Sequence, residues 1–90
     1  MTKQEIERKL RIAVSEVTGY GGNEITLESS LENDLKLDSL DTVELVMAVE
    51  DEFLLEVSQD DEEDAHEKVK TFGDLLSFVE KLVEKQHKDE

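Results

Sequence analysis

The sequence predicts an all-α fold, a small bundle of three or four helices joined by short connections and one long loop. Two observations predict it. Apolar residues recur at helical spacing in three separate segments, and each of these segments begins with Thr or Asp followed three positions later by an acidic residue. With a length of 90 residues the chain has room for one small core, so we expect a single domain over 1–90.

The first helix is expected over residues 2–17. Thr2 and Glu5 have the spacing of a capping box, and Gly19 stands where a glycine commonly ends a helix. One face of this helix is apolar and consists of Ile6, Leu10, Ala13, Val14 and Val17. The glycine-rich run that follows, residues 19–23, is interpreted as a loop.

The next segment, residues 25–37, has no clean periodicity, and we expect a long ordered loop with at most one short helical turn. Its apolar residues are regularly spaced, which places the loop on the core: Ile25, Leu27, Leu31, Leu35 and Leu37. A strand pair here is only weakly supported, because no other segment offers a partner strand.

The clearest helix is expected over residues 38–53, with Asp38 as its N-cap and Asp41 as the capping-box acid. On a helical wheel, one apolar face contains Leu45, Val49 and Phe53, with Val46 and Thr42 beside them, and we assign this face to the core. A second apolar face, nearly opposite, contains Leu40, Val43 and Met47 and is surrounded by Glu44, Glu50 and Asp51. This second face is either a transient docking surface or is packed under the long loop or a short helix.

The rest of the chain predicts two further helices. An acidic run over 59–66 leads into a short helix that ends by residue 70, and a last helix starts with the cap spacing of Thr71 and Asp74. The apolar residues of the last helix are Phe72, Leu75, Leu76, Val79, Leu82 and Val83. We expect the acidic segment over about 58–68 to be solvated and flexible, and the C-terminus over about 85–90 to be frayed. The acidic run lacks the alternating ligands and the glycine of a calcium-binding loop, so we assign no metal site.

Composition narrows the classes of partner. The chain has 25 acidic and 10 basic residues, a formal net charge of −15, which argues against nucleic acid and anionic membranes and favours basic protein surfaces. It has no Cys, so disulfides and thiolate metal sites are excluded. It also has no membrane-spanning stretch and no N-terminal targeting pattern, so we expect a cytoplasmic monomer that does not bind membranes stably.

Ser39 stands in the first turn of the central helix, where free backbone N–H groups would stabilise a phosphate ester. Local chemistry alone favours the simpler interpretation that Asp38 and Ser39 only cap the helix. A serine hydrolase is not supported, because no base lies near Ser39 in the sequence and no glycines of a nucleophile elbow flank it. The two histidines, His66 and His87, lie in charged stretches and are assigned no role.

The sixteen residues from Asp38 to Phe53, D-S-L-D-T-V-E-L-V-M-A-V-E-D-E-F, closely resemble the attachment-site helix of bacterial-type acyl carrier proteins. The stretch T-F-G-D-L from Thr71 resembles the start of that family's last helix, and the acidic composition and the long loop agree. The resemblance implies a four-helix bundle with a long first loop and a short third helix. It also implies a carrier that is a substrate of enzymes and not itself an enzyme.

The resemblance implies that a phosphopantetheinyl transferase, using coenzyme A and Mg²⁺, attaches 4′-phosphopantetheine to Ser39, between Asp38 and Leu40. The arm would carry acyl chains as thioesters to enzymes of fatty-acid or related lipid biosynthesis that have basic docking surfaces. The implied docking residues are Leu40, Asp41, Val43, Glu44, Met47, Glu50 and Asp51, and those of the acyl-chain pocket are Leu45, Val46 and Val49. Two alternatives remain: a carrier of aminoacyl or polyketide cargo, and an acidic helical interaction module without a prosthetic group.

The chain departs from the family pattern in two places. Lys36-Leu37 stands where the family often has Gly-Ala, which puts a bulky side chain and a positive charge beside the prosthetic group. After Phe53 the run L-L-E-V-S has no proline, and the segment over 59–70 is longer and more acidic than usual. These departures leave the position of the third helix and the acyl-chain length open, and they would fit a specialised carrier.

Overall fold

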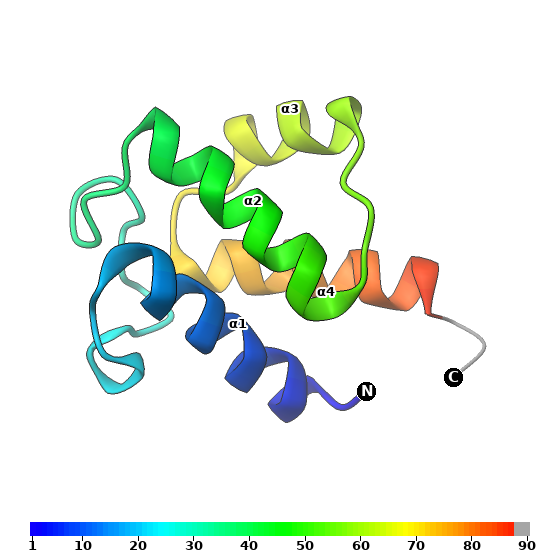
Figure 1. Ribbon diagram of the computed structural model, residues 1–90, viewed down its shortest axis with the longest axis horizontal. Helices are drawn as coiled ribbons and strands as arrows, with labels where there is room; N and C mark the ends of the chain where they lie inside the picture. Colours follow the sequence, from blue (N-terminus) through cyan, green and yellow to red (C-terminus); the bar gives the residue numbers. More distant parts are fainter. Residues whose placement is uncertain (88–90) are drawn as a thin grey trace.

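A computed structural model describes residues 1–87, and this part of the chain forms four α-helices and no extended strand. They are α1 (Lys3–Thr18), α2 (Ser39–Phe53), α3 (Gln59–Lys68) and α4 (Phe72–Gln86), with a short 3-10 turn, η1 (Gly22–Glu24), after α1. Helix α1 packs against both α2 and α4, and α3 lies at the side of the bundle and contacts α4 (Figure 1). The predicted all-α bundle with a long first loop and a short third helix is confirmed.

Each α-helix begins where a side chain caps its N-terminus. Complete capping boxes start three of them: Asp38 with Asp41 at α2, Ser58 with Asp61 at α3, and Thr71 with Asp74 at α4. At α1 the predicted box is only half formed. The Thr2 side chain accepts a hydrogen bond from the Glu5 N–H at 3.2 Å, but the Glu5 carboxylate accepts from the Thr2 hydroxyl and not from its backbone. Gly19 ends α1 in the left-handed conformation, with φ 83°, as predicted.

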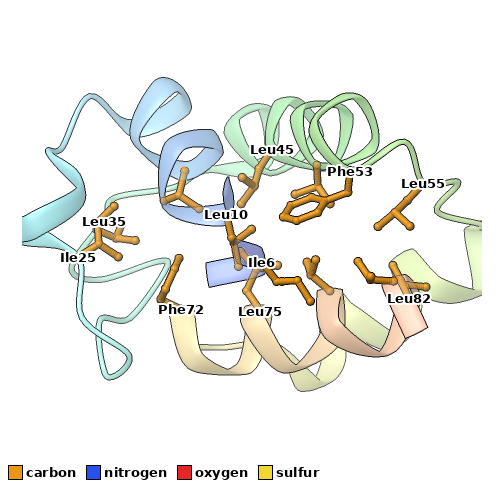
Figure 2. Close-up of a cluster of buried hydrophobic side chains, with 14 of the residues drawn as sticks. Ile6, Leu10, Ile25, Leu35, Leu45, Phe53, Leu55, Phe72, Leu75 and Leu82 are labelled. Carbon is orange, nitrogen blue, oxygen red and sulfur yellow. The ribbon is translucent and has the colours of Figure 1, made fainter. Parts of the chain in front are cut away.

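The hydrophobic core lies between α1, α2 and α4, whose apolar faces point toward one another (Figure 2). Leu45, Val49 and Phe53 are the buried residues of α2, as the helical wheel predicts. Burying side chains of this size contributes about 1.5–3 kcal/mol each. Thr42, expected beside this face, is exposed, and its hydroxyl donates to the Asp38 carbonyl at 2.9 Å.

The long loop covers the end of the core that is nearest the start of α2. Ile25, Leu35 and Leu37 are buried and Leu31 is half-buried, which confirms that the loop lies on the core. Leu27 departs from this pattern, because its side chain is 50% exposed. The regular spacing of these five residues therefore overstates how many of them reach the interior.

The loop pairs with Thr71 and the first residues of α4, a partner that the sequence pattern does not reveal. Ser30 and Thr71 form an isolated antiparallel bridge, and the Phe72 N–H donates to the Ser29 carbonyl at 2.9 Å. The Gly73 N–H donates to the Leu27 carbonyl, also at 2.9 Å. A Cβ atom at Gly73 would lie 2.9 Å from that same oxygen, so the close approach of the two segments requires glycine here.

The acidic segment expected to be flexible over 58–68 forms helix α3. Its capping box and the acidic residues of its first turn stabilise the helix N-terminus. Near the other end, Lys68 forms an ion pair with Asp64 at 3.1 Å, one turn earlier. No residue of α3 is buried, and its carboxylates are mostly exposed, as expected for a solvated segment. Val57 and Val69, which flank the helix, are half-buried against the core.

Helix α4 continues through Gln86, so residues 85–86, expected to be frayed, are helical. The Gln86 side chain explains this, because it donates to the Glu56 carbonyl at 2.8 Å and accepts from the Glu56 N–H at 2.9 Å. The remainder of the segment expected to fray, residues 88–90, lies outside the described residues. Within residues 1–87, no helix has the length and apolar character needed to cross a lipid bilayer.

Candidate functional site

Helix α2 starts at a turn that two acidic side chains hold in place. The Asp38 carboxylate accepts from the Asp41 N–H at 2.9 Å, and the Asp41 carboxylate accepts from the Asp38 N–H at 3.2 Å. Together these two residues complete the cap. Ser39, the first helical residue, is exposed and takes no part in it.

The Ser39 hydroxyl is left unused by the fold. It makes no hydrogen bond with any part of residues 1–87, and the N–H groups of Ser39 and Leu40 have no acceptor there either. Free N–H groups and the positive end of the helix dipole stabilise an anionic group at this position. The interpretation that Ser39 merely caps the helix therefore loses its support, and the site fits a phosphate ester on the serine oxygen.

A shallow, open hollow of about 460 Å³ lies beside the start of α2. The end of α1, the long loop and the first turn of α2 form its lining, namely Val17, Thr18, Gly19, Tyr20, Leu35, Lys36 and Asp41. Lys36 has φ 60°, in the left-handed region that glycine adopts without steric cost, and its side chain is exposed. Leu37 is buried in the core, so the lysine is the residue of this pair whose side chain is exposed.

The second apolar face of α2, made of Leu40, Val43 and Met47, is open to solvent, and we call it the outer face. The three side chains are 76%, 58% and 58% exposed. These values exclude the alternative that the long loop or α3 covers them. An exposed apolar face on a helix that already buries its other face is typical of an interaction surface.

The acidic residues around the outer face are of two kinds. Glu44 and Asp51 are exposed, and their carboxylates make no hydrogen bond or ion pair with other groups of residues 1–87. Asp41 and Glu50 are half-buried and support the fold. Asp41 belongs to the capping box, and the Glu50 carboxylate accepts from the Val57 N–H at 3.1 Å. Of these four residues, Glu44 and Asp51 are therefore the two whose carboxylates do not stabilise the described fold.

Leu54 is an exposed apolar residue that belongs to neither of the two apolar faces predicted for α2. It ends α2 in the left-handed conformation, with φ 53°, and its side chain is 81% exposed. It follows Met47 by seven residues, about two helical turns, and this spacing was the signal that could have placed it near the outer face.

The predicted acyl-chain residues lie on the opposite side of α2. Leu45 and Val49 are buried in the core, and Val46 is half-buried. None of the three lines the hollow beside the start of α2. Their role in an acyl-chain pocket stays a prediction. As for metal ligands, nowhere in residues 1–87 do three or more His, Asp or Glu side chains gather in a way that could hold an ion.

Comparison with known protein families identifies the class of protein to which this chain belongs. A family model described as "Phosphopantetheine attachment site" matches residues 8–77, which run from α1 into α4 and include Ser39. The fold and this match define a carrier domain that bears phosphopantetheine and is not an enzyme.

Sequence similarity to individual proteins identifies the family to which the chain belongs. An acyl carrier protein of Exiguobacterium sibiricum is 41% identical over 83 residues, which cover 92% of this chain and all of that relative. An acyl carrier protein of Prochlorococcus marinus is 41% identical over 80 residues, which cover 89% of this chain and 95% of the relative. The chain therefore belongs to the acyl carrier protein family.

Proposed function

We propose that the protein carries acyl intermediates as thioesters on a 4′-phosphopantetheine arm attached to Ser39, and presents them to enzymes of fatty-acid or related lipid biosynthesis. The family supplies the kind of prosthetic group. The observation that carries the assignment of the residue is the exposed Ser39 hydroxyl, which has no partner within residues 1–87, at the capped start of α2. We place this activity in the cytoplasm, with the protein as a monomer.

Loading transfers the phosphopantetheinyl group from coenzyme A to the protein. The Ser39 oxygen forms a bond to the phosphorus next to the pantetheine, and the bond from that phosphorus to the bridging oxygen of the diphosphate breaks. The adenosine 3′,5′-bisphosphate leaves, and the hydroxyl proton passes to a base of the transferase. The arm then supplies a thiol that holds the acyl group as a thioester.

The protein's own residues prepare this serine in two ways. The Asp38–Asp41 capping box fixes the turn and keeps Ser39 exposed, so a transferase can reach it. The N–H groups of Ser39 and Leu40, together with the helix dipole, stabilise the negative charge of the phosphodiester. Ser39 is thus presented to the transferase, which in this proposal supplies the base for the transfer.

We propose that enzymes dock on the outer face of α2. Leu40, Val43 and Met47 give an apolar centre, and exposed Glu44 and Asp51 attract basic enzyme surfaces. Asp41 and Glu50 add negative charge beside it. Exposed charges mainly set the rate and orientation of encounter, so such docking is weak and salt-sensitive, as a carrier that visits several enzymes requires. The inner face with Leu45, Val46 and Val49 is where we propose that the acyl chain is sheltered.

Intact mass after incubation with coenzyme A, Mg²⁺ and a broad-specificity phosphopantetheinyl transferase tests the attachment site. We expect the wild type to gain one phosphopantetheinyl group. Ser39→Ala should gain none and keep its helical circular-dichroism spectrum, because the Ser39 side chain has no part in the cap. Ser77→Ala, which removes another exposed helical serine, is the matched control and should be modified like the wild type.

Three results would contradict the proposal. If the wild type gains no mass while a competent carrier in the same tube does, the chain is an acidic interaction module without a prosthetic group. If Ser39→Ala still gains mass, the arm is attached elsewhere. If Ser39→Ala loses its helical signal, the serine is structural.

A further inference from the structure

Lys36 is an isolated positive charge close to the proposed attachment site. It is the only Lys or Arg between Arg11 and Lys68, a stretch that contains most of the acidic residues of the chain. It lies three residues before Ser39, in the irregular segment that leads into α2. Any negative group added at Ser39 therefore has a single cationic side chain near it in the sequence.

Among the described residues, this cation has no partner. The Lys36 side chain is exposed, and its ammonium makes no ion pair or hydrogen bond with any group of residues 1–87. It lines the same hollow as Asp41, which stands in the first turn of α2. Lys36 thus lies on the side of the molecule where α2 begins, and its charge is not neutralised by any group of residues 1–87.

The backbone of Lys36 also conflicts with local preference. Its φ of 60° is sterically costly for a lysine and free of cost for a glycine. Such conflicts concentrate at functional sites, where the side chain is needed despite the backbone. The Lys36 side chain is exposed and forms no ion pair or hydrogen bond within residues 1–87, so it makes no polar contact that would stabilise the described fold.

We propose that Lys36 is the counter-ion of the phosphodiester formed on Ser39 and positions the base of the prosthetic arm. The inference rests on the proposed attachment at Ser39. The phosphodiester brings a negative charge next to the carboxylates of Asp38 and Asp41, which repel it. The ammonium at the end of the flexible lysine stem offsets this repulsion and holds the phosphate at one side of the helix start. Lys36 is a positioning residue in this role and takes no part in the transfer itself.

The test compares melting temperatures of the apo and loaded forms of three proteins: the wild type, Lys36→Gln and Lys81→Gln. Glutamine keeps the cost of the left-handed backbone, so the comparison isolates the charge. Lys81→Gln removes an exposed lysine from α4 and controls for the change in net charge. At low salt we expect Lys36→Gln to lower the melting temperature of the loaded form by about 2–4 °C more than that of the apo form.

The additional loss of melting temperature in the loaded form of Lys36→Gln should vanish at high salt, because salt screens the attraction between two exposed charges. The ³¹P resonance of the phosphodiester should also shift in Lys36→Gln and stay in place in Lys81→Gln. Equal melting shifts of apo and loaded forms together with an unmoved ³¹P resonance would overturn the proposal. If the transferase loads the wild type and Lys81→Gln but not Lys36→Gln, the proposal is also overturned, because the lysine then acts in recognition by the transferase. Absence of loading on the wild type is a separate result, which rejects the attachment at Ser39 itself.

Discussion

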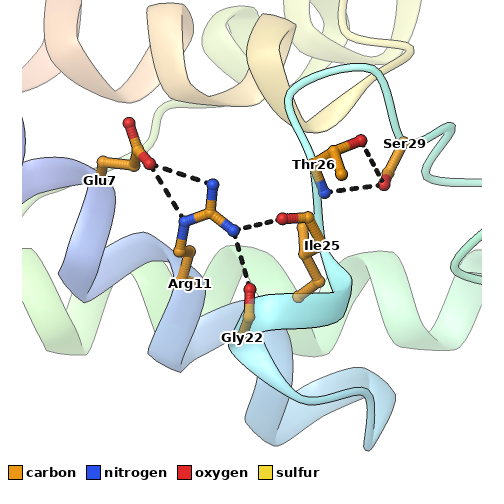
Figure 3. Close-up of polar contacts among 6 residues, drawn as sticks. All are labelled: Glu7, Arg11, Gly22, Ile25, Thr26 and Ser29. Atoms are coloured by element: carbon orange, nitrogen blue, oxygen red, sulfur yellow. Dashed lines mark hydrogen bonds and ion pairs between the residues drawn. The ribbon is translucent and has the colours of Figure 1, made fainter.

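Arg11 holds the loop between α1 and α2 in place through its guanidinium (Figure 3). The group donates to the carbonyl oxygens of Gly22, at 2.8 Å, and Ile25. It also pairs with Glu7 at 3.0 Å and lies 5.1 Å from the centre of the Phe72 ring. One side chain of α1 thereby connects η1, the loop and the start of α4. The sequence gives no sign of this, because arginines on a helix are ordinarily solvated.

We expect Arg11→Met to destabilise the protein by about 1–3 kcal/mol, because two backbone carbonyls lose their donor while the aliphatic stem is kept. Urea unfolding followed by circular dichroism measures this. Arg8→Met removes the same charge from an exposed position of the same helix and should change stability by no more than about 0.5 kcal/mol. Equal effects of the two substitutions would show that the carbonyl contacts are not stabilising.

Within residues 1–87, Asp74 is the one residue whose pKa is clearly shifted. The backbone N–H of Lys70 and then that of Thr71 donate to its carboxylate, at 3.0 and 3.1 Å, and these bonds lower its pKa below the ordinary value of 3.8. The folded state therefore prefers the charged carboxylate. Asp74 contributes stability above the ordinary pKa, and this contribution is lost as the pH falls through the lower folded value.

Asp74→Asn should accordingly unfold more easily than the wild type at about pH 7, and the difference should shrink toward about pH 2. Denaturant melts at both pH values give the two differences. Glu84→Gln, which removes an exposed carboxylate from the same helix, serves as control and should not destabilise at neutral pH. A gap between Asp74→Asn and the wild type that stays constant with pH would mean that the charge of Asp74 is not what stabilises the start of α4.

At the level of elements, the sequence predicts α2 almost completely. The cap spacing of Asp38 and Asp41 and the buried face through Phe53 are local or periodic features, and the structure confirms both. The same periodicity predicts a second apolar face but leaves open whether another segment covers it, and the structure shows that its side chains are exposed. The spacing of apolar residues does not predict contacts between two segments that are distant in the chain. The bridge between Ser30 and Thr71 depends on tertiary packing, which no local pattern records.

Helix α3 illustrates a different limit of sequence reasoning. Its acidic run predicts a solvated segment, and the carboxylates are indeed mostly exposed. The cap at Ser58 and the ion pair between Lys68 and Asp64 nevertheless make the segment helical. Charge composition predicts where side chains lie relative to solvent, whereas capping and spacing decide the backbone.

The outer face of α2 gives a prediction for docking. We expect Glu44→Lys to weaken binding of the apo protein to a phosphopantetheinyl transferase by about tenfold at low salt, because an attraction becomes a repulsion. Stability should change by no more than about 0.5 kcal/mol, since Glu44 is exposed and its carboxylate binds no backbone group of residues 1–87. Titration calorimetry at low and high salt measures the effect, which high salt should reduce.

Glu84→Lys makes the same change of charge on α4 and should leave transferase binding nearly unchanged. If both substitutions weaken binding equally, net charge and not the outer face guides the encounter. If Glu44→Lys binds like the wild type at low salt, the docking surface lies elsewhere on the molecule.

On the scale of the whole molecule, charge opposes folding. The net charge of −15 is held in a fold with a radius of gyration of 12.0 Å. The Debye length in about 0.1 M salt is near 10 Å, so carboxylates across much of the molecule repel one another when less salt is present. We therefore expect the melting temperature to rise when NaCl or Mg²⁺ is added, by general screening and without a metal site.

A variant of α3 tests whether this repulsion is the cause. Glu63 and Glu67 are exposed like charges one helical turn apart, and Glu67 lies at the negative end of the helix dipole. Replacing both with Gln should raise the melting temperature at low salt by about 3–6 °C and flatten its rise with added salt. This pair leaves the Ser58–Asp61 cap and the Lys68–Asp64 ion pair intact, so a gain reports on charge alone. If the melting temperature changes with neither added salt nor this substitution, repulsion between the carboxylates does not lower the stability of the bundle. Screening by salt would then not be what sets its melting temperature.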